Sequence, residues 1–289
     1  MSYENPDVLR HSEGFWLVHK SLTVSLIATR RDDHAPQGSV RTCRVDDSLA
    51  QVRADNINPA FDYLPVEKDG RDIVGLFHAK CYVNAPGNDE QGLVRDHTCP
   101  LSEADLIGGD ATIFDFISRV HEKPLLVVSG ERINGLVAWS DLQKLPVRAA
   151  VFALVTGFEL TMYEAIKAVF PEDDGWRGHL SNARLKKAET VFDQRSGNES
   201  DVELLLCTEF CDKRTILKRC LRFDPRAQES QSIPMSKRKF ESAVEQIEDL
   251  RNPLVHASSY AMSWDAVQHL KETVRILVDL RNHIKRVTV

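Results

Sequence analysis

The sequence predicts an α+β domain over residues 1–146, followed by an all-α helical bundle over residues 147–289. Before Pro146, short runs rich in Val, Ile and Leu alternate with short helical patterns, and Gly, Pro or charged turns separate them. After Pro146, apolar residues recur almost throughout at helical spacing. The charge is also divided, because residues 1–147 hold 15 Lys and Arg against 22 Asp and Glu, whereas residues 148–289 hold 22 against 21.

In the first domain, runs rich in Val, Ile and Leu predict strands, and one amphipathic run predicts a helix. The helix covers residues 111–121, where Ile113, Phe116 and Ile117 share a face. A second helix begins at Asp141 and continues toward Leu145. The strands are expected at residues 22–28, 71–77, 124–128 and 132–138.

In the second domain, the helical period predicts a series of helices with short connections. Pro171 ends the first, Ser200 or Asp201 caps the third, and Ser236 caps the fourth. The expected helices cover residues 147–170, 179–194, 201–221, 236–250 and 264–285. Helices joined by short connections pack as an antiparallel bundle.

The composition favours a globular cytoplasmic protein without a membrane segment. The longest apolar stretch, near residues 149–155, is much shorter than the roughly 18–20 residues that span a bilayer. Acidic residues and a proline near the N-terminus do not fit a signal peptide. The cysteines contain no CxxC pair. Cys207 and Cys211, four residues apart, would share a helix face, either as half of a metal or redox site or as small apolar fillers in a reducing compartment. We favour the fillers and expect no metal site.

The first domain resembles a pair of CBS modules. The resemblance rests on residues 112–142, TIFDFISRVHEKPLLVVSGERINGLVAWSDL, which run from helix to strand, tight hairpin, second strand and helix. The hairpin is at Ser129–Glu131, the strand glycine is Gly135, and the aspartate that opens the next helix is Asp141. A weaker copy comprises a helix at 46–54, a strand at 63–66, and a hairpin with a strand at 69–80. Two copies imply a CBS pair over residues 1–146.

This resemblance implies an adenine nucleotide as a regulatory ligand, with Gly135 and Asp141 in its site. In nucleotide-binding CBS pairs, an aspartate accepts from the ribose hydroxyls, and a Ser or Thr three residues earlier reaches phosphate. Here Ala138 stands at the hydroxyl position, and His78 and Cys81 replace both groups in the first copy. Asp141 is interpreted equally well as a helix N-cap.

The second domain resembles a HEPN domain through residues 240–260, FESAVEQIEDLRNPLVHASSY. Arg251, Asn252, three further residues and His256 match the RNxxxH signature of HEPN ribonucleases, and they lie between an amphipathic helix and the last long helix. The resemblance covers residues 147–289. It implies a homodimer in which two copies of the motif face each other across a two-fold axis.

The chemistry of RNA cleavage explains these residue types. A histidine is suited to remove the 2′-OH proton near neutral pH, and the oxygen then attacks its own phosphate. A guanidinium can hold two of the phosphate oxygens on which charge develops. Asn252 is expected to orient His256 or to donate to phosphate. Glu159, a carboxylate among apolar neighbours, is expected to pair with Arg251 or to join the site, although a partly exposed salt bridge explains it equally well.

The function predicted from these resemblances is a metal-independent endoribonuclease of the toxin or defence and stress effector type, gated by a nucleotide in the CBS pair. Its partner is an RNA substrate, and catalysis requires no cofactor. The alternative is a non-catalytic regulator, in which the CBS pair senses a ligand and the bundle dimerises or docks a partner. In that case Arg251 would pair with Glu248 or Asp249, and His256 would cap or pack at a helix end.

Overall fold

The computed structural model divides into two compact units, Leu22–Val147 and Arg148–Val289, the second of which also includes Ser21. We call them the sheet unit and the helical unit. The structure describes residues 21–31, 40–57, 60–69, 72–82, 92–172, 175–197, 202–226, 232–256 and 258–288.

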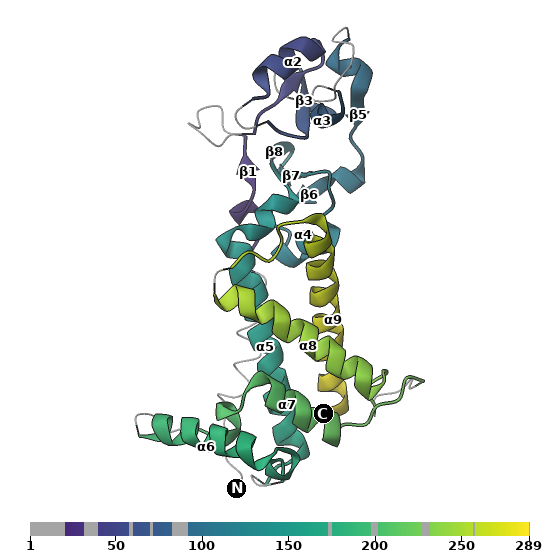
Figure 1. The fold of residues 1–289 in the computed structure, drawn as a ribbon. Coiled ribbons are helices and arrows are strands. Elements are labelled where there is room, and N and C mark those ends of the chain that lie inside the picture. Colours follow the sequence, from purple (N-terminus) through teal and green to yellow (C-terminus); the bar gives the residue numbers. More distant parts are fainter. Residues whose placement is uncertain are drawn as a thin grey trace. The chain divides into compact units, whose positions relative to one another are not determined.

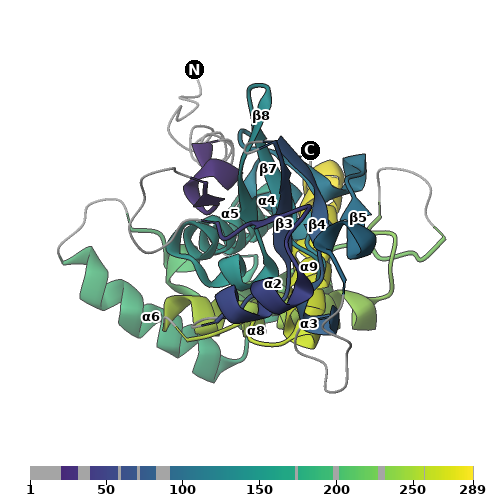
Figure 2. The same ribbon diagram turned by 90° about the horizontal axis from the view of Figure 1, so that it is seen from above.

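The sheet unit contains two four-stranded sheets, with strand orders β2-β3-β4-β5 and β1-β8-β7-β6. In each sheet the central hairpin is antiparallel, and one outer strand runs parallel to the hairpin strand beside it. Figure 2 labels the hairpin strands β3, β4, β7 and β8. The first sheet comprises β2 (Cys43–Arg44), β3 (Leu64–Lys68), β4 (Asp72–Phe77) and β5 (Thr98–Pro100). The second comprises β1 (Thr29–Arg30), β6 (Leu106–Gly108), β7 (Leu125–Ser129) and β8 (Arg132–Val137). Short helices connect the strands: η1 (Val24–Leu26), α2 (Leu49–Asp55), α3 (Ala79–Tyr82), η2 (Val94–His97), η3 (Glu103–Asp105), α4 (Ile113–Arg119) and η4 (Trp139–Gln143).

The two sheets are copies of one pattern, down to the register of their strands. Val66 faces Gly75 in the first hairpin, and Val127 faces Gly135 in the second. The register shifts immediately after Val66 and after Val127, so the same irregularity occurs in both hairpins. This repeat confirms the two-copy organisation that the sequence predicted for the first half.

Each sheet is completed by a strand that precedes the other copy in sequence. β1 precedes the first copy but pairs with β8 of the second, and β5 precedes the second copy but pairs with β4 of the first. The close approach of these strands requires glycine. A Cβ atom would lie 2.4 Å from the carbonyl oxygen of Thr29 at Gly135, and 2.6 Å from that of Cys99 at Gly75. The two copies therefore share a backbone interlock.

Local sequence signals begin the helices of the sheet unit. The Thr112 hydroxyl accepts from the backbone N–H of Asp115, whose carboxylate accepts from the N–H of Thr112 at 2.9 Å, which is a capping box. At the start of α2, the Ser48 hydroxyl accepts from the backbone N–H of Gln51. Apolar side chains then fill the core of the first copy: Cys43, Leu49, Val52, Leu64, Val66, Phe77, Ala79 and Val94.

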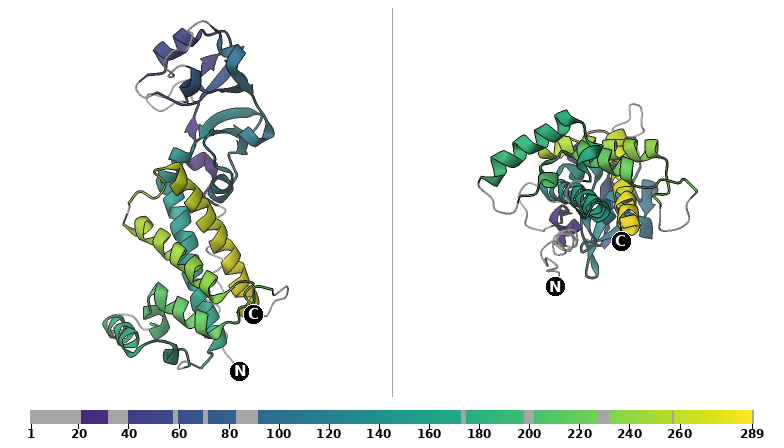
Figure 3. Two further views of the ribbon diagram at one scale, coloured as in Figure 1. Left: turned by 45° about the vertical axis from the view of Figure 1, so that its right-hand side comes forward. Right: turned by 90° about the horizontal axis from the view of Figure 1, so that it is seen from below.

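The helical unit is built mainly from long helices. Figures 1 and 3 show α5 and α9 running beside each other, with α8 crossing them. The unit comprises α5 (Leu145–Val169, whose first residues belong to the sheet unit), η5 (Arg177–His179), α6 (Asn182–Ser196), η6 (Leu204–Cys207), α7 (Phe210–Cys220), α8 (Lys237–Val255) and α9 (Trp264–Thr288). The helical second half is thus confirmed.

One apolar face of each of α8 and α9 forms much of the bundle core. The α8 face consists of Phe240, Val244, Ile247, Leu250 and Leu254. The α9 face includes Val267, Leu270, Val274, Leu277, Leu280 and Ile284. These positions follow the helical period, so burying them fixes which side of each helix turns inward.

Three expectations about local structure are wrong. Residues 22–28 do not form a strand, because residues 24–26 form η1 and the strand begins at Thr29. The single helix expected over residues 201–221 is also not formed, because the helical conformation is interrupted between η6 and α7. A new capping box between Glu209 and Asp212 starts α7. Cys207 and Cys211 consequently lie on different helices, so the face that the four-residue spacing predicted does not exist. The predicted caps Ser200 and Asp201 lie outside the described residues.

Among the described helices, α5 alone is long and apolar enough to meet a simple criterion for a membrane span. Half of the most apolar 18-residue segment of α5 is buried inside the protein. A core helix of a soluble protein meets the same criterion, so α5 is weak evidence for a membrane segment.

Candidate functional site

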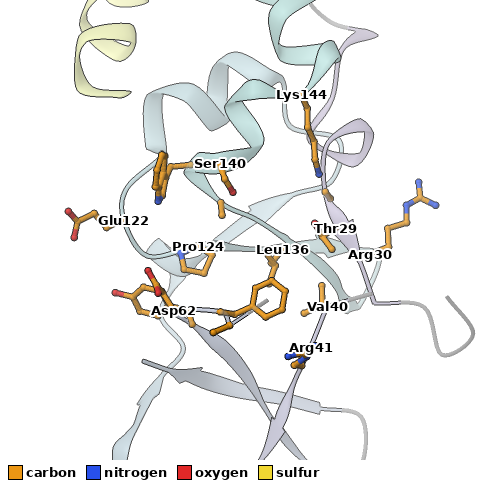
Figure 4. A pocket seen from close by; sticks show the side chains of 16 residues that line it. Thr29, Arg30, Val40, Arg41, Asp62, Glu122, Pro124, Leu136, Ser140 and Lys144 are labelled. Carbon is orange, nitrogen blue, oxygen red and sulfur yellow. The ribbon is translucent and has the colours of Figure 1, made fainter. Parts of the chain in front are cut away.

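A cavity of about 1190 Å³ lies in the sheet unit, where the two copies meet. Its walls come from β1, from the segments that precede β2, β3 and β7, and from the end of β8 and the segment that follows it. Figure 4 shows Lys144 and Ser140 on one side, and Asp62 and Arg41 on the other. The lining residues are Ala28, Thr29, Arg30, Val40, Arg41, Ala60, Phe61, Asp62, Tyr63, Glu122, Pro124, Leu136, Ala138, Trp139, Ser140 and Lys144.

Lys144 is a cation held in place at the cavity wall. Its ammonium group lies 2.9 Å from Oδ1 of Asp141 and also donates to the carbonyl oxygen of Ile27. The Lys144 side chain is 40% exposed, whereas that of Asp141 is 10% exposed. The ammonium group is therefore oriented by two protein oxygens while part of the side chain stays open to a ligand.

Asp141 supports the wall and does not line the cavity. Oδ2 of Asp141 accepts from the backbone N–H of Ala138 at 2.7 Å, so the carboxylate closes the first turn of η4. Its other oxygen binds Lys144. The sequence predicted either a helix cap or a ribose ligand here; the capping contact is present, and the ribose contact stays a prediction. Asp141 caps from the third residue of η4, and Ala138 occupies the N-cap position itself.

Aromatic and acidic side chains form the opposite wall. The Tyr63 ring stacks on His78 with 4.2 Å between centroids and 5° between planes. Burial raises the pKa of Tyr63, and the neighbouring Cys81 and Glu122 act in the same direction, so its hydroxyl stays a neutral donor. The guanidinium carbon of Arg41 lies 5.3 Å from the centroid of Phe61. This wall offers flat apolar surface beside donors and acceptors.

Gly135 lies one residue before the cavity-lining Leu136, beneath the interlock with β1. Its backbone contact with Thr29 leaves no room for a side chain. That contact accounts for the glycine without a ligand, and its predicted part in nucleotide binding stays a prediction.

Sequence reasoning missed most residues of the cavity. Lys144, Arg30 and Arg41 gave no motif, because they come from separate segments that only the strand pairing brings together. One signal was available for Lys144. It lies three residues after Asp141, close enough along the chain for the two to pair.

The helical unit places Arg251 beside Glu159 but also ties Glu159 to a second cation. Nη2 of Arg251 lies 3.7 Å from Oε2 of Glu159, while Nζ of Lys213 lies 3.1 Å from Oε1. The Lys213 side chain is 3% exposed and donates to the carbonyl oxygen of Thr208 at 2.7 Å. Glu159 is thus the central anion of a three-residue chain, and the predicted pairing with Arg251 is present.

The other residues of the RNxxxH motif face solvent. Asn252 and His256 are exposed, and the Arg251 side chain is 39% exposed. His256 is the residue that ends α8, and its N–H donates to the carbonyl oxygen of Asn252 at 3.1 Å. Five helical positions separate Arg251 from His256, about 140° around the helix axis, so one α8 does not direct both side chains to one point. Their catalytic role stays a prediction.

One further cluster gathers acidic groups around a cation. Glu209, Cys211 and Asp212 offer ligand atoms close together, but Arg184 occupies their centre, with Nε 2.7 Å from Oδ1 of Asp212. Hydrogen bonds from Lys187 and Arg184 lower the pKa of Glu209 to about 2. These carboxylates are already neutralised by Arg184 and Lys187.

No protein-family model and no curated protein matches the chain. Among solved structures, the CBS domain of a bacterial CNNM/CorC family Mg²⁺ transporter in complex with ATP is 18% identical. The match covers 48% of this chain and 96% of that chain, with a TM-score of 0.36. A hemolysin-like CBS-domain protein of Oenococcus oeni PSU is 14% identical, covering 45% and 93%, with a TM-score of 0.36. The CBS-pair protein CBSX2 of Arabidopsis thaliana is 17% identical, covering 45% and 94%, with a TM-score of 0.34.

All three of these neighbours are CBS-domain proteins. The predicted HEPN identity of the helical unit is not tested by them and stays a prediction.

Proposed function

We propose that the sheet unit is a regulatory module that binds a nucleotide in its cavity. One observation carries this proposal: at the seam between the two copies, a cavity of nucleotide size combines cations, hydroxyl groups and aromatic surface. Ligand cavities of roughly 300–1,000 Å³ with a few convergent polar groups are typical of small-molecule sites. The volume here, about 1190 Å³, lies somewhat above that range.

The lining matches the parts of a nucleotide. Lys144 and Arg30 supply positive charge for phosphate, and Ser140 and Thr29 supply hydroxyl donors. Phe61, Tyr63 and Trp139 offer apolar surface for a base. Carboxylates at Asp62 and Glu122 can accept from sugar hydroxyls, a task that the CBS resemblance had assigned to Asp141. Adenine is the base that this resemblance implies.

Calorimetric titration of the full chain with ATP, AMP and adenosine tests the proposal. Lys144→Ala should weaken ATP binding about tenfold or more and leave adenosine binding nearly unchanged, because only ATP carries the phosphate charge. Lys68→Ala is the matched control, since Lys68 is an exposed lysine of the same unit that does not line the cavity. Absence of binding to all three ligands at millimolar concentration would contradict the proposal.

A second candidate function, RNA cleavage by the helical unit, is favoured by the accessibility of Arg251, Asn252 and His256. His256 would remove the 2′-OH proton, and Arg251 would stabilise charge on the phosphate oxygens, leaving a 2′,3′-cyclic phosphate and a 5′-OH. Because the two side chains diverge around α8, catalysis would combine Arg251 and His256 of different copies in a homodimer. RNA phosphate would also compete with Glu159 for Arg251.

Incubation of single-stranded RNA with the wild type in EDTA, followed by end-group analysis, tests this candidate. Arg251→Ala and His256→Ala should each reduce cleavage at least a hundredfold, whereas His269→Ala, a change on α9, should not. If the wild type leaves the RNA intact both with and without ATP, the ribonuclease candidate is contradicted. The non-catalytic regulator, in which the helical unit dimerises or docks a partner, then remains.

A further inference from the structure

Arg148, in the first turn of α5, binds the backbone at the end of α8. Its Nη1 donates to the carbonyl oxygen of Pro253 at 2.8 Å and lies 3.5 Å from that of Leu254. Its Nη2 donates to the carbonyl oxygen of Ser258 at 2.9 Å. The guanidinium carbon also lies 5.1 Å from the centroid of the Tyr260 ring. One side chain thus contacts residues on both sides of His256.

The end of α8 needs such a cation. The last carbonyl groups of a helix have no partner within the helix and carry the negative end of its dipole. The last turn of α8 holds no basic residue, and the helix ends at His256 without a glycine. The Pro253 carbonyl accepts both from Arg148 and from the N–H of Ser258, the latter at 2.9 Å. The charge that satisfies this end therefore comes from α5.

We infer that Arg148 is a positioning residue that fixes the backbone around His256, and that the cavity of the sheet unit regulates this segment through α5. The geometry supports the first part directly. His256 lies between Leu254 and Ser258, whose carbonyl oxygens both face the Arg148 guanidinium. Loss of this guanidinium would remove its contacts with three carbonyl groups and with the Tyr260 ring at once, and it would leave the Pro253 carbonyl with the N–H of Ser258 alone.

The second part rests on the proposed function of the cavity. Lys144 lines the cavity and precedes the first residue of α5. Its carbonyl oxygen accepts the N–H of Val147 at 3.0 Å, so Lys144 takes part in the first turn of the helix. Arg148 follows four residues after Lys144. A phosphate that draws the Lys144 ammonium away from Asp141 and Ile27 acts on the residue from which the helix carrying Arg148 starts.

Hydrogen–deuterium exchange of the full chain, read on peptides covering residues 253–260, tests the positioning role. Arg148→Ala should raise exchange at the Ser258 amide about tenfold or more, because a hydrogen bond from a charged donor to the same carbonyl is lost. Exchange on the core face of α9 should not change. Arg148→Lys should give an intermediate increase, since an ammonium can hold a carbonyl but lacks the fork of donors. Arg275→Ala, on the exposed side of α9, is the control.

The outcomes separate the two parts of the inference. Unchanged exchange over residues 253–260 in Arg148→Ala would overturn the positioning role. Should Arg148→Ala not fold, Arg148→Lys decides in its place, and wild-type exchange in that variant would overturn the role. ATP added to the wild type should change exchange over 253–260, and Lys144→Ala should abolish that response. If ATP binds but the exchange stays unchanged, the link to the cavity is overturned. If ATP does not bind, the proposed function fails, while the Arg148 result still stands.

Discussion

The two units differ in how far apart in the sequence the partners of their polar contacts lie. In the sheet unit, carboxylates close the first turns of short helices by accepting from a backbone N–H three residues earlier. The pairs are Asp115 with Thr112, Asp105 with Ser102, and Asp141 with Ala138. The helical unit has such local caps too, for example Asp212 with Glu209, and it adds contacts between distant segments, such as Arg148 with Pro253 and Lys213 with Glu159. The two copies of the sheet unit are held together by close backbone contacts at glycines, whereas the helical unit depends on charges placed by the tertiary fold in addition to its local caps.

This difference predicts where single substitutions act most strongly. In the helical unit, the sensitive sites should be buried charges whose partners come from other helices. In the sheet unit, they should be the sites of close backbone approach. The predictions below test each half of this comparison.

The largest effect is expected from Glu159→Ala. The change leaves the Lys213 ammonium, on a side chain only 3% exposed, with the Thr208 carbonyl but without its carboxylate. Breaking a buried pair in this way costs about 3 kcal/mol, because the remaining charge is uncompensated. Urea unfolding followed by circular dichroism at a helix-sensitive wavelength measures the loss. Glu272→Ala, which removes an exposed partner of Arg275, should leave the midpoint almost unchanged. Equal midpoints for the two variants would contradict the comparison.

A somewhat smaller effect is expected from Gly135→Ala in the sheet unit. The added methyl group would meet the Thr29 carbonyl oxygen at 2.4 Å, so β1 must move away from β8. Overpacking of this kind costs about 2 kcal/mol. Gly178→Ala has no atom within 4 Å of the new Cβ and is the matched control. Calorimetry should show the lower Tm only for Gly135→Ala, and an unchanged Tm would argue against the interlock of the two copies.

The smallest effect concerns alkaline pH. Burial raises the pKa of Tyr260 to about 12 from 10.0, against the opposing effect of Arg148. A raised folded pKa means that the stabilisation is complete below pH 10 and is lost as the pH rises toward 12. Tyr260→Phe should therefore flatten the decline of stability over this window. The comparison is best made in a Cys220→Ala background, because burial also raises the pKa of Cys220 to about 11. If the Tyr260→Phe variant declines as steeply as its parent, Tyr260 ionises normally in the folded protein.

Much of the fold could be predicted from sequence because its signals are local. Runs rich in Val, Ile and Leu marked the strands expected at residues 71–77, 124–128 and 132–138, and the periodic positions of α8 and α9 marked their buried faces. The break before Phe210 was missed because the apolar residues on either side continue a helical period across it. Glu159 was singled out as a carboxylate among apolar neighbours, and its ion pair with Arg251 is present.

The candidate sites were less predictable, for a physical reason. Arg30 and Lys144 reach one cavity only because β1 crosses to the second sheet. No spacing in the sequence encodes that crossing. Arg148 likewise carries no motif, since its acceptors are backbone carbonyls more than a hundred residues away. Side chains that bind side chains leave a pattern of complementary residues, but side chains that bind backbone do not.

The crossing of β1 and β5 has a consequence for how the first half of the chain can be divided. A cut between residues 82 and 92 would leave each fragment with a strand that belongs to the other fragment's sheet. Neither fragment could then complete its sheet alone, and each would expose an unpaired edge. Mixed together, the fragments would be expected to recover the fold by complementation, as the halves of one cooperative unit and not as two independent modules.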